Sequence, residues 1–392
     1  MRTFYLVGGN CPRSRQDAQT IINYFKLNKI KQVKKINDAD IIIIYSCGGF
    51  DSGEIGSLET LNEVVDKKSS KAIVVFTGCL PKINIDSIPE NIRNLDSFKI
   101  INFEDFSDVD EIINATVRFD EVQDAGIIKN IPMLGKSSTL KRFFYDLKSE
   151  PNKMFNIFTN LINKHNEYDS RFYHVRVSRG CLCNCSYCAI RLSRGKLKSS
   201  TIEQIKKDIE EGIKRGYNKF VLVGEDTGCY GLDIGKNSVD LLKIFFSYKQ
   251  IKKLMINDFN PQWFVRYYDE LEKLFIENKN RIEDFRVPIQ SGSNKILKLM
   301  KRPYDVNDVK DCLIKIKNKI PELKIHTHII VGFPGETNED FKESCDLLKE
   351  IKFYKIIFYP YEDRHVTESS KLKEKIPEDL INQRLKIIKK IV

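Results

Sequence analysis

Three closely spaced cysteines constrain this chain more than any other feature of its sequence. Cys181, Cys185 and Cys188 have the spacing C-x-x-x-C-x-x-C, and Cys183 adds a further thiol inside the same segment. Thiolate is a soft ligand that selects iron–sulfur clusters, zinc or Cu(I). We therefore expect this short segment to wrap around one metal centre.

Two kinds of centre are compatible with the segment. A structural zinc site normally has four protein ligands, so a zinc knuckle would need Cys183 as its fourth ligand. A four-iron cluster on Cys181, Cys185 and Cys188 would leave one iron open to chelate a small molecule, which is typical of radical S-adenosylmethionine (SAM) enzymes. The spacing favours the cluster, with Cys183 as a bystander.

The start of the chain predicts a parallel sheet. Short apolar runs, as found in strands buried on both faces, cover residues 3–7, 40–45 and 72–76, and helical patterns lie between them. This alternation indicates βαβ units.

Another set of cysteines follows these expected strands. Cys11, Cys47 and Cys79 each come just after the carboxyl end of one strand, where open α/β sheets bind ligands. We therefore expect a second metal site there. The alternative is three buried core cysteines, since free cysteine is often buried.

Beyond residue 170, strand-like and helical patterns alternate, which predicts a partial (β/α)6 barrel. The expected strands cover residues 172–177, 220–223, 253–256, 285–289, 325–331 and 356–359. Polar, glycine-rich stretches follow three of these strands, at 224–227, 290–293 and 332–337. Because glycine lets a ligand approach the backbone closely, these stretches favour a nucleoside-containing cofactor.

The length of 392 residues indicates more than one domain. We expect an α/β chain in four parts. These parts are an N-terminal open parallel-sheet domain at 1–115 that binds the second metal centre, a linker with helices at 116–170, the radical-SAM barrel at 171–370 and a C-terminal helix at 371–392. Within the linker, helical character is expected over 141–162.

The composition of the chain indicates its cellular compartment, the role of its cysteines and the kind of partner it could bind. No apolar run is long enough to span a membrane and no signal peptide is visible, so we expect a cytoplasmic protein. Ten cysteines in such a chain indicate metal ligation in place of disulfides. The formal net charge of +11 is compatible with nucleic-acid binding, although Lys and Arg are spread throughout the chain.

Taken together, these motifs resemble the radical-SAM methylthiotransferase family over nearly the whole chain. Cys181, Cys185 and Cys188 match the ligands of the family's SAM cluster, with Tyr187 among them. The ligands of its auxiliary cluster are matched by Cys11, Cys47 and Cys79. Further family motifs are matched by residues 224–233, 288–302 and 330–341.

The resemblance implies two 4Fe-4S clusters and SAM as cofactors. In this chemistry SAM is cleaved to a 5′-deoxyadenosyl radical that abstracts hydrogen from an unactivated C–H bond. The auxiliary cluster then supplies sulfur, and a second SAM supplies the methyl group. The implied SAM-binding residues are Gly224, Glu225, Gln290, Ser291, Gly332 and Tyr187; no side chain receives a catalytic role.

The substrate follows less directly from the resemblance. Family members act on tRNA adenosine derivatives or on a ribosomal-protein aspartate, and we expect a tRNA adenosine derivative near the anticodon. The alternatives are a peptide or protein side chain, sulfur insertion without methylation, and a metal-binding protein without activity. A reducing electron donor of the flavodoxin or ferredoxin kind is expected as a partner.

The sequence also departs from the family pattern. The thiol of Cys183 is additional, and Arg191 and Met255 stand where the family usually has Pro and Arg. Cys229, Cys312 and Cys345 are expected to be structural. Family members normally continue into a small basic β-barrel, the TRAM domain, and we expect this chain to work without it.

Overall fold

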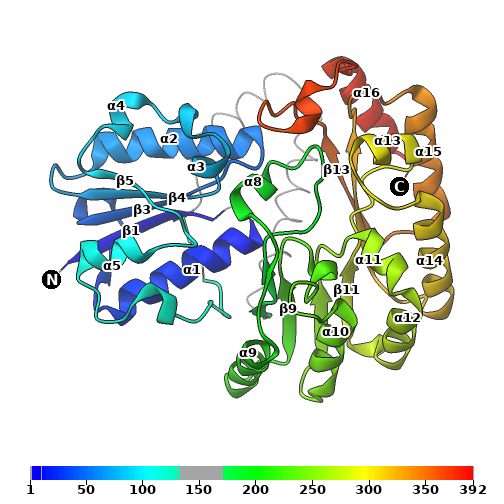
Figure 1. Ribbon diagram of the computed structural model, residues 1–392, viewed down its shortest axis with the longest axis horizontal. Coiled ribbons are helices and arrows are strands. Elements are labelled where there is room, and N and C mark those ends of the chain that lie inside the picture. The colour runs from blue at the N-terminus through cyan, green and yellow to red at the C-terminus, as the bar shows by residue number, and fades with distance from the viewer. Residues whose placement is uncertain (1, 10, 130, 133–170, 392) are drawn as a thin grey trace. The chain divides into compact units, whose positions relative to one another are not determined.

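The computed structural model describes residues 2–9, 11–129, 131–132 and 171–391 (Figure 1). The fold divides after His174 into two compact units, which are described separately below. The helical segment expected at 141–162 lies outside the described residues.

The first unit is built on a parallel sheet in the order β2-β1-β3-β4-β5. Its strands are β1 (Thr3–Gly8), β2 (Lys31–Gln32), β3 (Ile41–Ser46), β4 (Ile73–Gly78) and β5 (Phe98–Ile100). All six residues of β3 are buried, as the apolar run predicts for a central strand. The edge strands β2 and β5 escaped sequence analysis because they are only two and three residues long.

Helices cover both faces of this sheet (Figure 1). They are α1 (Pro12–Leu27), α2 (Asp51–Lys67), α3 (Leu80–Ile83), α4 (Glu90–Arg93) and α5 (Ser107–Ile113). One apolar core forms under α1 and α5, and another under α2, α3 and α4. The core under α1 also includes Ile131 and, partly buried, Phe119 and Val122, so residues beyond 115 stabilise this unit.

The second unit is built on a six-stranded sheet in the order β13-β12-β11-β10-β9-β6. Its strands are β6 (Tyr173–Arg176), β9 (Lys219–Val223), β10 (Lys253–Ile256), β11 (Ile282–Arg286), β12 (Ile325–Val331) and β13 (Lys355–Pro360). Strands β9 to β13 pair in parallel in chain order, which is the arrangement of a partial barrel. The α/β class and both parallel sheets are therefore confirmed.

One strand lies elsewhere than the apolar pattern indicated. We expected residues 285–289, whereas β11 covers Ile282–Arg286. Its pairing with β10 begins at Ile282, opposite Leu254. Pro288 has no backbone N–H to donate to a neighbouring strand, so the regular ladder ends before it.

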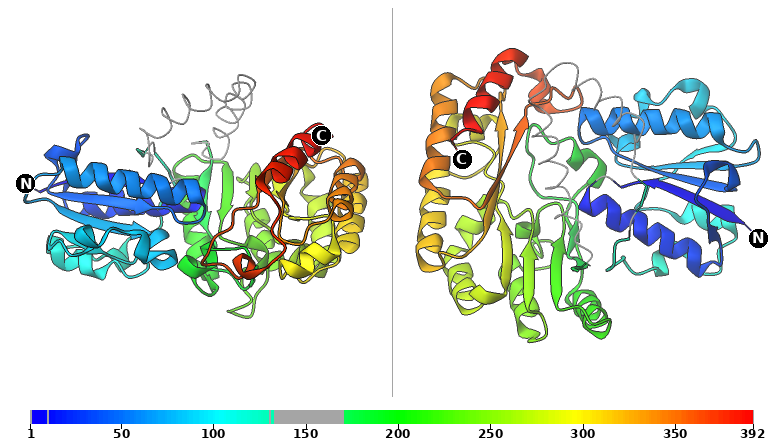
Figure 2. Two further views of the ribbon diagram at one scale, coloured as in Figure 1. Left: turned by 90° about the horizontal axis from the view of Figure 1, so that it is seen from above. Right: turned by 180° about the vertical axis from the view of Figure 1, so that it is seen from behind.

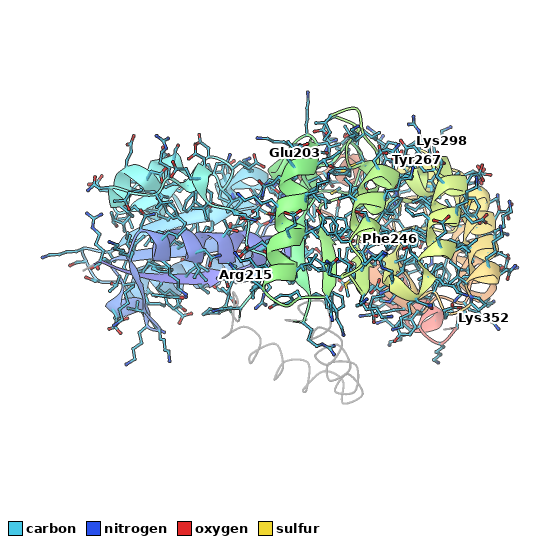
Figure 3. All side chains as sticks on the ribbon, turned by 90° about the horizontal axis from the view of Figure 1, so that it is seen from below. Glu203, Arg215, Phe246, Tyr267, Lys298 and Lys352 are labelled. Atoms are coloured by element: carbon cyan, nitrogen blue, oxygen red, sulfur yellow. The ribbon has the colours of Figure 1, made fainter. Side chains whose placement is uncertain are left out.

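The helices of this unit are α8 (Ile190–Arg194), α9 (Ile202–Lys214), α10 (Ser238–Ser247), α11 (Pro261–Arg266), α12 (Tyr268–Glu277), α13 (Asn294–Leu299), α14 (Val306–Lys319), α15 (Asn338–Glu350) and α16 (Glu378–Ile388). Helix α9 is amphipathic: Ile205 and Ile209 are buried, whereas Glu203 and Arg215, near its two ends, are exposed (Figure 3).

Across the described residues, no helix has the length and apolar character needed to cross a membrane.

The C-terminal helix α16 packs against the end of the sheet (Figure 2). Ile381, Leu385 and Ile388 are buried in one cluster with residues of β12 and α15. This contact matters for the site because β12 ends at Val331, directly before one of the glycine-rich stretches.

Candidate active site

A short antiparallel hairpin delivers the cysteine segment of the second unit. Strand β7 (Ser178–Arg179) pairs with β8 (Lys198–Ser199), and the cysteines lie in the connection between them. Gly180 has a φ of +70°, and a Cβ there would lie 2.1 Å from the Lys196 carbonyl oxygen. Only glycine fits this turn, so the residue before Cys181 is fixed by backbone geometry.

Hydrogen bonds hold the middle of the cysteine segment in place. The Ser186 hydroxyl donates to the Leu299 carbonyl at 2.8 Å, and the Ser186 amide donates to the Met300 carbonyl at 3.0 Å. The Cys188 amide donates to the Cys185 carbonyl at 3.1 Å, which closes a turn. Burial raises the pKa of the Cys188 thiol to about 11, so a positive metal centre would be needed to hold it as thiolate.

An arginine from a distant part of the sequence lies beside this turn. Arg302 is buried, and its Nη1 lies 3.6 Å from Cys185 Sγ. Its Nε donates to the Tyr304 hydroxyl at 3.1 Å, and its Nη2 donates to the Pro288 carbonyl at 2.5 Å. Burial alone would lower the pKa of Arg302, but Tyr304, Tyr187 and Cys185 raise it, so a fixed positive charge faces a cluster-ligand candidate.

A buried carboxylate lies next to Cys181. Asp226 accepts from Trp263 Nε1 at 2.9 Å and from the backbone amides of Gly228 and Asn260 at 3.0 and 3.1 Å. Burial, and then the charge of Cys181, raise the pKa of Asp226 to about 7. Among the described residues, one group of three possible ligands has its ligand atoms within 4.8 Å of one another: Cys181, Asp226 and Cys229.

Two of the remaining predicted SAM residues, Glu225 and Gln290, follow strands β9 and β11, and Tyr187 lies in the cysteine segment. Glu225 follows β9, and its Oε1 lies 3.6 Å from Arg194 Nε in a buried pair. Gln290 has a φ of +79°, and its buried Oε1 has no hydrogen-bond partner among the described residues. The Tyr187 ring packs edge-on against Phe333, with ring centroids 6.4 Å apart.

Ser291 is positioned differently from its predicted neighbours. It is 1% exposed, and its hydroxyl lies 3.5 Å from the Ser344 hydroxyl of α15 and accepts from the Ser293 amide. Its side chain is therefore engaged within the protein. Gly224 lies where a Cβ would be 2.8 Å from the Ser178 hydroxyl, so its small size leaves room for the Ser178 side chain.

A buried ion pair fixes the loop after β12. Gly332 has a φ of +83°, and a Cβ there would lie 2.3 Å from Ile381 of α16. The Gly332 amide donates to Glu336 Oε2 at 2.9 Å, and the same carboxylate accepts from Arg384 Nη1 at 2.7 Å. Helix α16 therefore holds the glycine-rich loop through both packing and charge.

The first unit brings its three predicted cysteines to one edge of its sheet. Cys11 caps α1 after β1, and its Sγ lies 3.1 Å from the Ser14 hydroxyl. Cys47 and Cys79 follow β3 and β4, whose final residues Ser46 and Gly78 are paired in register. Because β1, β3 and β4 are adjacent, the three thiols share one end of the sheet.

The spacing of the two cysteine sets is compatible with four-iron clusters. The thiolates of such a cluster bind separate irons, so they lie farther apart than the ligands of one ion. In the described part of the chain, neither full set meets the 4.8 Å spacing of a single-ion site. All ten cysteines are free thiols, and a Cβ on Gly53 would lie 2.6 Å from Cys47 Sγ, so glycine keeps space open beside that sulfur.

Two protein-family models match the chain, one in each unit. Residues 175–348 match the Radical SAM superfamily, and residues 3–99 match the uncharacterized protein family UPF0004. The first match spans the cysteine segment and the three glycine-rich loops. The fold and the site therefore define a radical-SAM enzyme with an additional N-terminal domain.

Similar proteins narrow the class further. A probable threonylcarbamoyladenosine tRNA methylthiotransferase from Pyrococcus horikoshii is 30% identical over 387 residues, covering 99% of this chain and 83% of that protein. The ribosomal protein uS12 methylthiotransferase RimO from Thermotoga maritima is 26% identical, covering 95% and 79%. The chain belongs to the radical-SAM methylthiotransferase family, and it is an enzyme of that type. Members of this family use SAM, a 4Fe-4S cluster and a second 4Fe-4S cluster, consistent with the two matched regions.

Solved structures with low sequence identity share the fold. The radical S-adenosylmethionine methyltransferase TsrM from Kitasatospora setae has a TM-score of 0.59 at 11% identity, covering 92% of this chain and 75% of that chain. The cobalamin-dependent S-adenosylmethionine radical enzyme OxsB has a TM-score of 0.53 at 14% identity, covering 100% and 56%.

Sequence reasoning missed three residues of the site. Asp226 was seen only as part of a polar stretch, and Cys229 was expected to be structural. Arg302 was noted only within a matching motif, because nothing in the spacing links it to Cys185, 117 residues away. Two signals were available for Asp226 and Cys229: a carboxylate and a thiol shortly after the end of a barrel strand.

Proposed function

We propose that this enzyme methylthiolates a tRNA adenosine derivative near the anticodon. The observation that carries the proposal is similarity along 99% to 100% of the chain, at 30% identity, to two Pyrococcus proteins named as probable threonylcarbamoyladenosine tRNA methylthiotransferases. The formal net charge of +11 supports a polyanionic substrate. Lys196 and Lys198, shortly after the cysteine segment, are exposed and available for phosphate contacts.

We assign the cofactors to residues as follows. Cys181, Cys185 and Cys188 hold the cluster that binds and cleaves SAM, and Cys11, Cys47 and Cys79 hold the second cluster. The clusters supply electron transfer and sulfur when bound. The N-terminal domain at 1–115 carries the second cluster, and the barrel at 171–370 carries SAM.

The chain's own residues bind and orient the nucleoside cofactor. Gln290 Oε1 is the strongest candidate contact, because a buried carbonyl oxygen without a partner gains most from a ligand donor. Gly224 and Gly332 are candidate backbone contacts at positions where a Cβ would meet Ser178 and Ile381, Glu225 is held by Arg194, and the Tyr187 ring packs against Phe333. Ser291 contributes through its backbone, because its hydroxyl is engaged with α15.

The substrate is tested with anaerobically reconstituted, reduced enzyme, SAM and bulk tRNA from cells that lack this gene. After digestion, mass spectrometry of the nucleosides should show a new methylthio-adenosine derivative. A thiol product without the methyl group would mean sulfur insertion alone. Formation of 5′-deoxyadenosine with unchanged nucleosides would contradict the tRNA proposal.

A ribosomal-protein substrate is the second candidate, because relatives named as uS12 methylthiotransferases match at 26% to 28% identity. The same reaction mixture with ribosomes in place of tRNA, followed by peptide mass analysis, tests it. A methylthio adduct on a ribosomal-protein peptide, with none on tRNA, would favour this candidate.

The cluster assignment is tested by iron content. The variant Cys11→Ala/Cys47→Ala/Cys79→Ala should keep one cluster and lose the other, so its iron per chain should fall to about half of the wild-type value. Full iron content in this variant would contradict the assignment. The matched control is Cys312→Ser, which removes a buried thiol on α14 outside both sets.

A further inference from the structure

Five lysines gather on the first unit where α1 leads into the edge strand β2. They lie within residues 26–35, a stretch that contains no acidic residue, and all five side chains are exposed: Lys26, Lys29, Lys31, Lys34 and Lys35. We call these residues the lysine patch. In the described part of the chain, no ion pair and no side-chain hydrogen bond is found for any of them. The function proposed above does not yet use this surface.

The patch differs in charge from the rest of its unit. Residues 1–132 contain 16 Lys and Arg against 19 Asp and Glu, which gives a formal net charge of −3. Outside residues 26–35 the balance is 11 basic against 19 acidic residues. The patch is therefore a local concentration of positive charge on an acidic domain, and the basic composition of the whole chain does not account for it.

The end of a helix explains only part of the patch. Lys26 lies in the last turn of α1, where a cation is favoured by the negative end of the helix dipole. That effect falls off within the last turn, so it does not reach Lys31, Lys34 or Lys35. These three like charges repel one another in the free protein, and a bound polyanion would relieve the repulsion.

The backbone that carries the lysines is firmly held. Asn28 Nδ2 donates to the Val117 carbonyl at 2.9 Å, and the Val33 amide donates to the Phe4 carbonyl at 2.8 Å. Ile30, in the middle of the stretch, is buried in the core under α1. A partner would therefore meet lysines on a rigid frame, and little backbone order would have to be gained on binding.

An open hollow of about 470 Å³ lies within the patch. Its lining consists mostly of lysines: Lys26, Lys29, Ile30, Lys31 and Gln32. Lys29 has a φ of +59°, and glycine is the usual residue at such a position after a helix. The chain thus carries a charge at the hollow where glycine would fit the backbone better, and the hollow suits an anionic group.

The chemistry of the patch favours a nucleic-acid backbone over a lipid surface. Surface helices that bind membranes combine basic residues with exposed Trp, Phe or Leu side chains that enter the lipid. Residues 26–35 contain no aromatic residue, and Leu27 is their one large exposed hydrophobic side chain. Phosphate contacts, in contrast, need only Lys and Arg that are free to replace the counterions of the nucleic acid.

The position of the patch indicates the size of its partner. Lys31 pairs with Thr3, the first residue of β1, whereas Cys11 follows the other end of that strand. Six residues of extended strand span about 20 Å. A partner that contacts the lysine patch and also reaches the cysteine edge of this sheet must therefore be larger than a nucleoside or a short peptide.

We propose that the lysine patch is a docking surface for the phosphate backbone of tRNA, remote from the nucleoside that is modified. The choice of tRNA rests on the function proposed above. Contacts of this kind are independent of sequence, so the patch supplies affinity and orientation and takes no part in the chemistry.

The test measures binding of bulk tRNA to the full-length, reconstituted enzyme by filter retention at several KCl concentrations. The patch variant is Lys31→Gln/Lys34→Gln/Lys35→Gln. The matched control is Lys206→Gln/Lys207→Gln/Lys214→Gln, which removes the same charge from exposed lysines of α9 that lie among acidic residues. Glutamine and lysine have similar helix propensities, so the control should keep its fold.

The patch variant should bind tRNA at least about tenfold more weakly at low salt, and its plot of log affinity against log salt should be less steep by about 2–3, because three phosphate contacts are lost. The control should bind like the wild type. Cleavage of SAM without RNA should be unchanged in both variants, which shows that they are folded. An unchanged salt slope in the patch variant, or equal losses in both variants, would overturn the proposal.

The docking surface and the substrate can fail separately. If the wild type makes a methylthio nucleoside and the patch variant binds tRNA normally, only the docking surface is wrong. If the patch variant loses tRNA binding but the wild type modifies no nucleoside, the surface binds RNA and the proposed substrate is wrong. Absence of tRNA binding by the wild type would overturn both. Loss of binding to phosphatidylserine vesicles, with tRNA binding intact, would assign the patch to a membrane and overturn the proposal.

Discussion

The ion pair between Glu336 and Arg384 offers the sharpest test of how helix α16 supports the site. Both side chains are almost fully buried, at 2% and 4% exposure, and Arg384 Nη1 lies 2.7 Å from Glu336 Oε2. Arg384 also donates to the Glu336 carbonyl and to Asn338 Oδ1, each at 3.0 Å. The perturbation is Arg384→Met, which keeps an apolar stem against Phe341 but removes the charge.

The expected loss in the free energy of unfolding is about 3–5 kcal/mol at pH 7, the range for removing one partner of a buried pair. Most of this loss comes from the carboxylate of Glu336, which stays buried without a counter-charge. Replacing both residues, as in Glu336→Gln/Arg384→Met, should therefore recover much of the lost stability, because no unpaired charge remains.

The loss should also depend on pH. Burial raises the pKa of Glu336, and Arg384 offsets part of that rise. Without Arg384, folded Glu336 holds its proton at a pH where the unfolded chain has lost it, near a pKa of about 4.3. The variant therefore loses stability as pH rises above that value, by up to about 1.4 kcal/mol per pH unit. Its deficit should be smaller at pH 5 than at pH 7.

The assay is urea unfolding followed by tryptophan fluorescence. Trp263 is the only tryptophan in the chain and is 9% exposed in the second unit, so its signal reports on the unit that contains α16. A deficit below about 1 kcal/mol at pH 7, with no change between pH 5 and pH 7, would refute the reasoning. Such values are typical of an exposed ion pair.

Three further predictions concern the same unit. Gly332→Ala should lower its stability by about 1–3 kcal/mol in the fluorescence assay and weaken SAM binding in calorimetry, because the new Cβ would meet Ile381 at 2.3 Å; unchanged values would contradict the close approach. Asp340→Asn should cost about 1–2 kcal/mol near neutral pH, because hydrogen bonds from Lys295 and Ser293 overcome the effect of burial and lower the pKa of Asp340 to about 2. Since that pKa lies below the unfolded value of about 3.9, the wild-type advantage is full above about pH 4 and disappears toward pH 2; a difference that persists at pH 2 would contradict it. Finally, Arg302→Gln should lower the midpoint potential of the SAM-binding cluster in an electron paramagnetic resonance titration, whereas Arg302→Lys should largely preserve it, because a fixed positive charge beside Cys185 favours the reduced cluster.

The sequence alone determined the two parallel sheets and the position of each cysteine relative to a strand. Apolar runs such as Ile41–Ile44 specify buried strands through local patterning, and the end of a strand can be located from the same pattern. The rule that ligands bind at the carboxyl ends of parallel strands then predicted where Cys11, Cys47 and Cys79 lie. Short edge strands and the bounds of β11 were not predictable in this way, because they depend on pairing with neighbours.

Only the tertiary structure decided which side chains meet. Arg302 reaches Cys185 across 117 residues, and Arg384 reaches Glu336 across 48. The sequence around Cys229 predicts only a structural thiol. Folding places this thiol close to Cys181 and Asp226. Local patterns fix strands and turns because those depend on neighbouring residues. Contacts between distant segments arise from the packing of the whole unit, which no short stretch of sequence encodes.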